Sequence, residues 1–288
     1  DGRRIALPSL DGIGIFDLDR QSFQLLTSSA WGSPAIRTAP ELRFVAWHPD
    51  GERVTFTGVD GDLYRIRADG GGEAERLTRS DASAQPSHRL QFPSSWAPDG
   101  RTLVFVQRLG STAAVNRDIW GLTLGDPAPA ARPLLVSAAD EPSAELSPDG
   151  RYLAYESNQS GHAEVYVQPF PEMGRREVVS IDGGGQPVWA TNGRELFYRV
   201  SQGSGRLMRM MAVNVRLGDV FTAGRPRLLW EASGARYPGG AGGRTYDVMP
   251  DGRRFLMIQQ RDLPQPPITQ VVLVQNWLDE LKRLVPGN

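Results

Sequence analysis

The sequence predicts an all-β fold, a six-bladed β-propeller with four-stranded antiparallel blades and a short C-terminal helix. Three observations predict it. A Pro-Asp-Gly turn recurs along the chain, its copies are separated by nearly the length of one propeller blade, and similar strand patterns flank each copy. Repeats of roughly 40–50 residues are typical of four-stranded blades. Because one such sheet buries too little surface alone, we expect the repeats to stack around a ring.

The turn motif fixes the position of each blade. The complete copies are Pro49-Asp50-Gly51, Pro98-Asp99-Gly100, Pro148-Asp149-Gly150 and Pro250-Asp251-Gly252, and the variants are Thr191-Asn192-Gly193 and Asp1-Gly2. Measured at the Asp or Asn, the separations are 49, 49, 50, 43 and 59 residues. Proline holds φ at about −65°, the Asp or Asn side chain accepts from nearby backbone amides, and glycine supplies the positive φ that closes the hairpin. We therefore assign a structural role in the turns to Asp50, Gly51, Asp99, Gly100, Asp149, Gly150, Asn192, Gly193, Asp251 and Gly252.

The segments on both sides of the turn repeat as well. A large apolar residue stands three positions before each Asp or Asn, and we expect it to pack between neighbouring blades. These residues are Trp47, Trp96, Leu146, Trp189 and Val248. A strand pattern follows the turn, as at 101–105 and 151–155, and third and fourth strands come after it, as at 118–120 and 227–230.

The repeats predict a single propeller domain over residues 1–288. Its blades span about 1–27, 41–79, 89–136, 141–180, 184–230 and 244–276. Blade six has expected strands near 244–249, 254–259 and 268–276. Apolar residues at i, i+1, i+4 and i+7 from Trp277 predict an amphipathic helix over 277–284. Blade one lacks its inner strand, which either precedes Asp1 or is supplied by the C-terminus.

Composition and charge exclude several classes of function. The chain has 288 residues, with 32 basic and 33 acidic side chains spread along its length. Without a basic block, binding of nucleic acid or of an anionic membrane is not expected. No apolar run is long enough for a membrane span. No signal peptide precedes Asp1, but the chain starts within a turn motif, so this says nothing about export. The absence of cysteine excludes disulfides and thiolate metal sites.

The sequence offers little for catalysis. The three histidines, His48, His88 and His162, are dispersed over different repeats, and the Gly-x-Ser-x-Gly motif of serine hydrolases is absent. The repeated aspartates belong to separate blades. Each is expected to accept hydrogen bonds from the backbone of its own turn, and they are too far apart to share a metal. We therefore predict no enzyme activity for this chain, no cofactor and no metal.

Several segments carry a family resemblance. They are SNQSGHAEVYVQPFP at 157–171, DGGGQPVW at 182–189, the stretches 192–198 and 246–248, and NWLDELKRLVP at 276–286. With the turn repeat, they make the whole chain similar to TolB-type, WD40-like propellers. More narrowly, they resemble the propellers that follow the membrane helix in bacterial serine/threonine protein kinases. Kinase motifs are absent from the chain, so the resemblance implies a sensor portion located outside the cytoplasmic membrane, in the periplasm or at the cell surface.

Candidate binding residues lie where one blade passes into the next. In propellers these connections gather at one face around the axis, and loops on a rigid scaffold commonly carry recognition. The connections are 28–40, 79–90, 137–142 and 232–243. Residues at the starts of inner strands point toward the central channel and form a predicted polar rim, over which the glycine-rich loop 232–243 reaches. The candidates are Arg43, His88, Gln91, Glu141, Gln186, Arg236, Tyr237 and Arg244.

These observations lead to a functional hypothesis with two alternatives. The chain is expected to bind a protein, peptide or cell-envelope ligand at one face, as the sensor domain of a receptor-type kinase. The first alternative is a stand-alone TolB-like periplasmic scaffold. The second is a polysaccharide lyase or hydrolase of propeller fold, which needs convergent histidines or carboxylates at the channel mouth.

Overall fold

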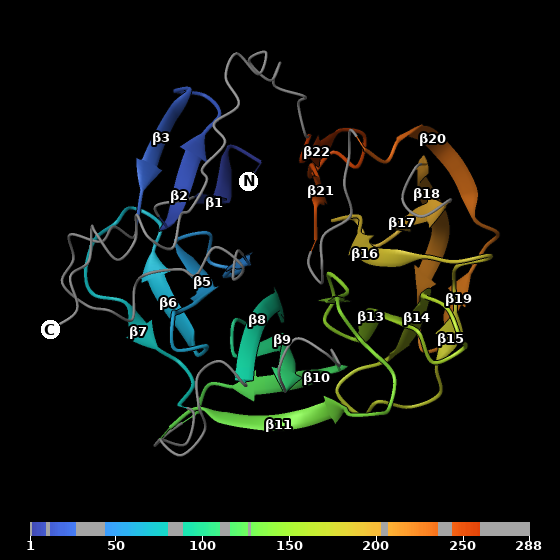
Figure 1. Cartoon of the computed structure of the whole chain (residues 1–288), viewed down its shortest axis with the longest axis horizontal. Coiled ribbons are helices and arrows are strands. Elements are labelled where there is room, and N and C mark those ends of the chain that lie inside the picture. The colour runs from blue at the N-terminus through green and yellow to red at the C-terminus, as the bar shows by residue number, and fades with distance from the viewer. Residues whose placement is uncertain are drawn as a thin grey trace, which may run out of the picture.

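The computed structural model describes residues 2–9, 12–26, 44–79, 89–109, 116–125, 128–202, 207–235 and 244–259. Every regular element in these residues is a β-strand. The strands form antiparallel sheets that follow one another in chain order around a ring (Figure 1). No helix long and apolar enough to cross a membrane occurs in this part of the chain.

Five of the sheets have three or more strands and are called blades 1 to 5. Blade 1 contains β1 (Arg4–Ser9), β2 (Gly12–Asp17) and β3 (Ser22–Leu25). Blade 2 contains β4 (Val45–Trp47), β5 (Arg53–Thr57), β6 (Leu63–Arg67) and β7 (Glu75–Arg76). Blade 3 contains β8 (Arg89–Trp96), β9 (Thr102–Leu109), β10 (Asn116–Thr123) and β11 (Ala130–Leu135).

The remaining sheets complete the ring. Blade 4 contains β12 (Ala144–Leu146), β13 (Tyr152–Ser157), β14 (Glu164–Pro169) and β15 (Glu177–Val178). Blade 5 contains β16 (Gly185–Trp189), β17 (Glu195–Gln202), β18 (Leu207–Leu217), β19 (Phe221–Ala223) and β20 (Arg227–Ser233). The last sheet, here called the terminal hairpin, contains β21 (Tyr246–Val248) and β22 (Phe255–Met257).

The prediction of six four-stranded blades is wrong in number. The described residues form five blades, of which blades 2, 3 and 4 have four strands, blade 1 has three and blade 5 has five. Blade 5 gains a strand because β18 is 11 residues long and pairs with both β19 and β20. The repeat marks turns and not complete sheets, and within the described residues its last copy gives the two-stranded terminal hairpin. The strand expected at 268–276 and the helix expected over 277–284 lie outside the described residues.

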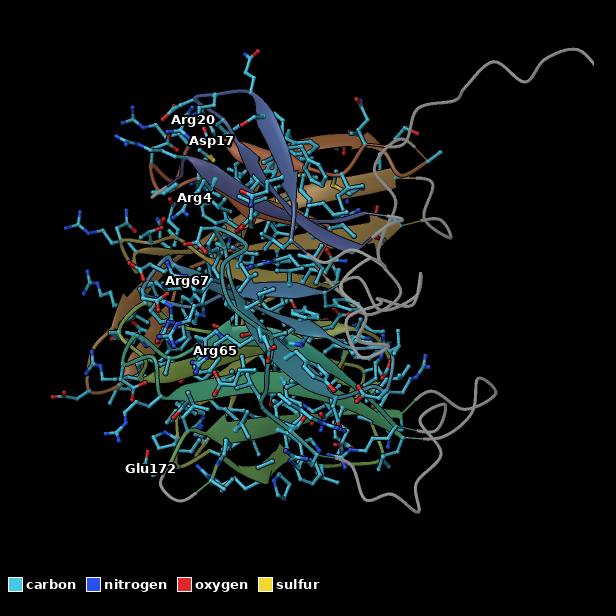
Figure 2. The ribbon with its side chains drawn as sticks, turned by 90° about the vertical axis from the view of Figure 1, so that its left-hand side faces the viewer. Arg4, Asp17, Arg20, Arg65, Arg67 and Glu172 are labelled. Carbon is cyan, nitrogen blue, oxygen red and sulfur yellow. The ribbon has the colours of Figure 1, made fainter. Side chains whose placement is uncertain are left out.

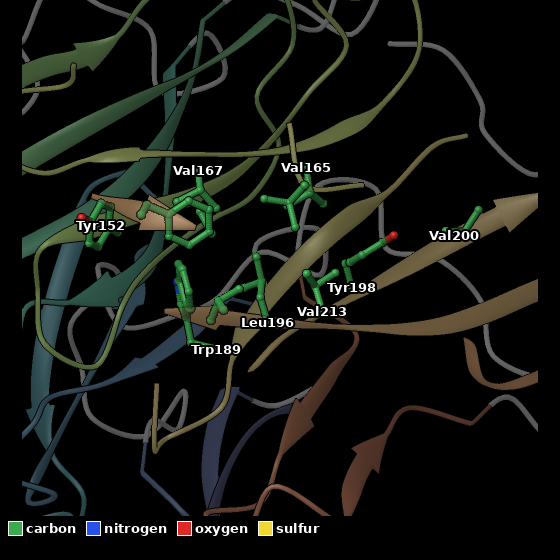
Figure 3. Close-up of a cluster of buried hydrophobic side chains, with 12 residues drawn as sticks. Tyr152, Val165, Val167, Trp189, Leu196, Tyr198, Val200 and Val213 are labelled. Carbon is green, nitrogen blue, oxygen red and sulfur yellow. The ribbon is translucent and has the colours of Figure 1, made fainter. Parts of the chain in front are cut away.

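The hydrophobic core lies between neighbouring sheets. Successive side chains of a strand point to opposite faces, so each strand contributes to two cores. Tyr152 and Ala154 of β13 pack in the cluster shared with blade 5, which Figure 3 shows, whereas Leu153 and Tyr155 pack in the cluster shared with blade 3. The same division holds at the junctions of blades 1 and 2, of blades 2 and 3, and of blade 5 and the terminal hairpin.

Two tryptophans at the ends of inner strands connect blades 3 and 5 to the blade before each of them. Trp96 is buried, and its indole N–H donates to Thr55 Oγ1 of blade 2 at 3.1 Å. Trp189 is buried as well, and its indole N–H donates to the backbone oxygen of Glu145 in blade 4 at 3.1 Å. These contacts agree with the packing between blades that the sequence pattern predicts.

The four Pro-Asp-Gly turns and the Thr191-Asn192-Gly193 turn share one geometry. In each, the glycine has φ between 66° and 72° and donates to the carbonyl three residues earlier at 2.8–2.9 Å. The Asp or Asn side chain accepts from the N–H two residues later at 2.8–3.1 Å.

Neighbouring turns also touch. A Cβ on Gly100 would lie 2.9 Å from the His48 ring, one on Gly150 would lie 3.0 Å from Pro98, and one on Gly2 would lie 3.0 Å from Pro250. The last contact brings the first blade against the terminal hairpin and closes the ring of turns.

Candidate functional site

The candidate binding residues that the structure describes lie at or just before the ends of the inner strands opposite the turns. Gln91, Glu141, Gln186 and Arg244 fall within the described residues. Arg43, His88, Arg236 and Tyr237 lie outside them. The first three of the described residues are buried at junctions between blades, with exposed fractions of 0%, 1% and 8%, and not exposed at a rim.

Gln91 joins blade 3 to blade 2. Its Oε1 accepts from Thr78 Oγ1 at 2.6 Å, and its Nε2 donates to Gln107 Oε1 at 3.2 Å. Its backbone oxygen accepts from Thr57 Oγ1 at 2.6 Å. Because the residue is fully buried and bonded on both sides, it holds two blades in register.

Glu141 occupies the equivalent junction between blades 3 and 4. Its Oε1 accepts from Ser137 Oγ at 3.0 Å and from Ser157 Oγ at 2.9 Å. Its Oε2 is buried and has no hydrogen-bond partner among the described residues. Burial raises the pKa of Glu141 to about 7; the two serine hydroxyls counteract this, and the nearby Asp118 and Asp140 add to it. Glu141 is therefore a carboxyl group that titrates near neutral pH inside the fold.

The sequence analysis missed a polar pattern that recurs at these junctions. In blades 2, 3 and 4 a hydroxyl residue stands two positions after the outer strand. An acid stands one residue before the third strand or within its first three residues. The hydroxyl residues are Thr78, Ser137 and Ser180, and the acids are Asp62, Asp118 and Glu164. Ser137 N donates to Asp118 at 3.2 Å, and Ser180 Oγ donates to Glu164. The acids lie 12, 19 and 15 residues after the Asp of their turns, so the pattern does not align on the turns and is visible only once the strands are placed.

Gln186 connects three sheets. It has a φ of 54°, a left-handed conformation that is rare for a non-glycine residue. Its N–H donates to Glu156 Oε2 of blade 4 at 3.0 Å, and its backbone oxygen accepts from Tyr246 Oη of the terminal hairpin at 2.8 Å. Its Oε1 accepts from Thr245 N at 3.0 Å and from Thr245 Oγ1 at 2.9 Å. These bonds offset the backbone strain and fix the side chain.

Arg244 forms an ion pair with the inner strand of a distant blade. Its Nη1 lies 2.7 Å from Glu145 Oε1 in β12, and Asp247 Oδ1 lies 3.9 Å from the same nitrogen. Glu145 Oε2 also accepts from Trp189 N at 3.0 Å. Burial raises the pKa of Glu145, an effect that Arg244 partly offsets. The two side chains are 32% and 17% exposed, so the pair is partly accessible.

These residues form one network, here called the inner cluster. It consists of Glu145, Glu156, Gln186, Arg199, Arg244 and Thr245. Arg199 donates to Thr245 Oγ1, and burial lowers its pKa. Of the six, the sequence analysis named only Gln186 and Arg244. Glu145 was detectable as a charged residue in the middle of the apolar strand 144–146.

The inner cluster offers charged groups and hydrogen-bonding groups. No group of three or more His, Cys, Asp or Glu side chains suited to a metal occurs among the residues that the structure describes. His48 is buried at a turn, with Nε2 3.0 Å from the Gly100 oxygen. His162 pairs with Glu164 in a hairpin of another blade, at 2.7 Å. Neither histidine belongs to the inner cluster.

Comparisons with known proteins place the fold. No family profile and no curated protein matches the sequence. A TolB structure from Agrobacterium tumefaciens is similar with a TM-score of 0.67 and 15% identity, over 91% of this chain and 88% of that one. TolB from Acinetobacter baumannii gives a TM-score of 0.52 and 16% identity, over 77% and 52%. A puromycin-hydrolyzing peptidase of Mycobacterium tuberculosis gives 0.55 and 20%, over 85% and 40%. At these identities the likeness establishes the propeller fold, which the chain shares with TolB-type propellers.

Proposed function

We propose that this chain is a non-catalytic binding propeller that recognises a protein, peptide or cell-envelope ligand where its inner strands begin. The observation that carries the proposal is the Arg244–Glu145 ion pair, which is partly exposed and stands next to the hydrogen-bonded group of Gln186, Thr245 and Arg199. Arginine is enriched among the residues that dominate binding energies.

The network supports binding because it is preformed. Gln186 and Thr245 are held by hydrogen bonds from three sheets, so little ordering is required when a ligand arrives. Rigid sites bind more tightly because less conformational entropy is lost. Arg43, His88, Arg236 and Tyr237 remain proposed members of the same binding face. The buried Gln91 and Glu141 are proposed to support it from the junctions between blades.

The parent architecture is a finer proposal. The segments 157–171, 182–189 and 276–286 resemble the propellers of bacterial receptor-type kinases, so we assign residues 1–288 to one extracytoplasmic sensor domain. A stand-alone TolB-like scaffold is the second candidate, favoured by the similarity to one TolB structure over 91% of this chain. A sensor is expected to bind a small envelope ligand, whereas a scaffold binds only a partner protein.

A thermal-shift screen against envelope saccharides, peptides and divalent cations tests the proposal, because a ligand that binds the native state raises Tm. We expect one ligand class to raise Tm and the ligand to be recovered unchanged by mass spectrometry. Conversion of the ligand would contradict a non-catalytic role. Absence of any shift would favour the scaffold.

A pair of variants locates the site. Glu145→Gln/Arg244→Gln removes both charges together, so no buried carboxylate loses its partner, and it is expected to reduce the ligand-induced shift by more than half. Arg209→Gln/Glu231→Gln removes a matched pair on the outer strands of blade 5, where Nε and Oε2 are 3.2 Å apart, and is expected to keep the full shift. An equal shift in both variants would place the binding site elsewhere.

A further inference from the structure

The opposite face of the ring, formed by the turns, carries an arginine two positions after the Asp or Asn of most turns. At four turns this residue is Arg101, Arg151, Arg194 or Arg253. Figure 2 shows the ring from its side, with Arg4, Arg20 and Arg67 pointing toward one face. Among the described residues, Arg151 pairs with Asp149, whereas the guanidinium groups of Arg101, Arg194 and Arg253 have no ion pair with an acid. Arg194 also lines a hollow.

Arg194 and Arg216 border a hollow between blades 4 and 5. The hollow has a volume of 440 Å³, and its other lining residues include Asp149, Thr191 and Asn192. An adjoining hollow of 490 Å³ shares Asn192, Arg194 and Arg216. Val215 N donates to Arg194 O at 2.8 Å, so β18 lies beside the turn here, and Arg194 and Arg216 both line the hollow.

The acids near this hollow already have partners. Asp149 accepts from Arg151 Nε at 2.9 Å and from Ser147 Oγ at 2.6 Å. Glu195 pairs with Arg227. Arg151 also donates to Leu217 O at 2.5 Å, which fixes its guanidinium on the same wall.

The two arginines beside the hollow are left uncompensated. Within the described residues, the guanidinium groups of Arg194 and Arg216 have no hydrogen bond and no ion pair, and both residues are exposed. Two positive charges therefore line the hollow, and the one acid that lines it, Asp149, is bound to Arg151 and Ser147.

We propose that this hollow binds an oxyanion, the carboxylate or phosphate group of a small polyanionic ligand. Each guanidinium presents a planar fork of donors that matches such a group, and charge-assisted hydrogen bonds of this kind are among the strongest in proteins. Asn192 uses Oδ1 to accept from Arg194 N at 2.9 Å, so its NH2 group remains as a donor for the ligand. The Thr191 hydroxyl is a further donor. The site is separate from the inner cluster because it adjoins the other end of β16.

Isothermal titration calorimetry with inorganic phosphate and with citrate tests the proposal. The wild-type chain is expected to bind at least one of them saturably at one site, and the tighter of the two identifies phosphate or carboxylate as the recognised group. Arg194→Gln/Arg216→Gln is expected to weaken binding at least tenfold. Arg216→Lys keeps the positive charge but loses the planar guanidinium group. Its affinity for the anion is expected to lie between that of the wild type and that of Arg194→Gln/Arg216→Gln.

The repeat supplies a matched control. Arg101→Gln/Arg253→Gln removes two exposed arginines at the same turn position in other blades, where they line neither hollow, and is expected to change the affinity less than twofold. The Tm of Arg194→Gln/Arg216→Gln should equal that of the wild type, because neither side chain has a partner in the described fold. No saturable binding by the wild type, or equal weakening in both double variants, would overturn the proposal.

Discussion

At the scale of single residues, Glu141 makes the stability of the junction between blades 3 and 4 depend on pH. One carboxylate oxygen accepts from two serines, and the other is buried without a partner among the described residues. The charged groups around it are Asp118, Asp140 and Arg117, of which Arg117 is bound to Asp140 at 2.5 Å. Ionisation of Glu141 therefore places a negative charge beside two others in a desolvated place.

The pH dependence of stability follows from the raised pKa. Since the pKa of Glu141 is about 7 in the fold and lies near its ordinary value in the unfolded chain, the folded state binds more protons between those values. The stability that the protonated Glu141 contributes is fully present below its pKa in the unfolded chain and is lost as pH rises through about 7. We predict that Glu141→Gln removes this loss, so that the variant gains roughly 1–3 kcal/mol relative to wild type between pH 5 and pH 8. Urea unfolding at both pH values measures it.

The control for this prediction is Glu172→Gln, an exposed carboxyl group. It should leave the pH dependence of unfolding unchanged. Asp50 and Asp251 do not interfere, because their pKa values of about 2 keep them ionised throughout this range. An identical pH profile for Glu141→Gln and wild type would show that Glu141 is not the group responsible.

At the scale of elements, β16 depends on a glycine at its start. A Cβ on Gly185 would lie 2.5 Å from Glu156 Oε2, the oxygen that accepts from Gln186 N. We predict that Gly185→Ala displaces the Glu156 carboxylate and costs about 1–3 kcal/mol of unfolding free energy, since a buried donor loses its partner. Gly125→Ala is the control, because its nearest neighbour would be 3.7 Å away. Equal midpoints in urea for the two variants would contradict this account of β16.

The elements also show what the sequence can and cannot predict. The turns were predictable because their chemistry is local: proline, Asp or Asn, and glycine act on adjacent backbone groups. Trp96 and Trp189 were predictable as packing residues from their place in the repeat. The strand count of blade 5 was not, because it depends on how far β18 extends past its hairpin. Gln91 was predicted at a polar rim, but it is buried between blades 2 and 3. The repeat pattern does not show whether a side chain points toward the propeller axis or toward the neighbouring blade.

At the scale of the whole molecule, stability depends on the packing between blades more than on any single blade. Leu103 of β9 is buried against Leu63 and Leu77 of blade 2. Removing its side chain therefore leaves a cavity that two blades share.

We predict that Leu103→Ala lowers the unfolding free energy by about 2–5 kcal/mol. Leu228→Ala, at a half-exposed position on β20, should cost less than about 0.5 kcal/mol. Tryptophan fluorescence and circular dichroism should report the same lowered midpoint in Leu103→Ala. Separate midpoints from the two probes would show that the blades unfold independently.

The placement of the cores between sheets has a consequence for how the sequence varies over evolution. A substitution that enlarges or shrinks Leu103 is compensated most directly at Leu63 or Leu77, in the preceding repeat. Correlated changes among homologues should therefore join positions in adjacent repeats, as Leu103 is joined to Leu63 and Leu77, which lie 40 and 26 residues earlier. Chimeras that exchange one repeat alone would separate such coevolved partners at both borders, whereas exchange of two adjacent repeats preserves the pairs between them.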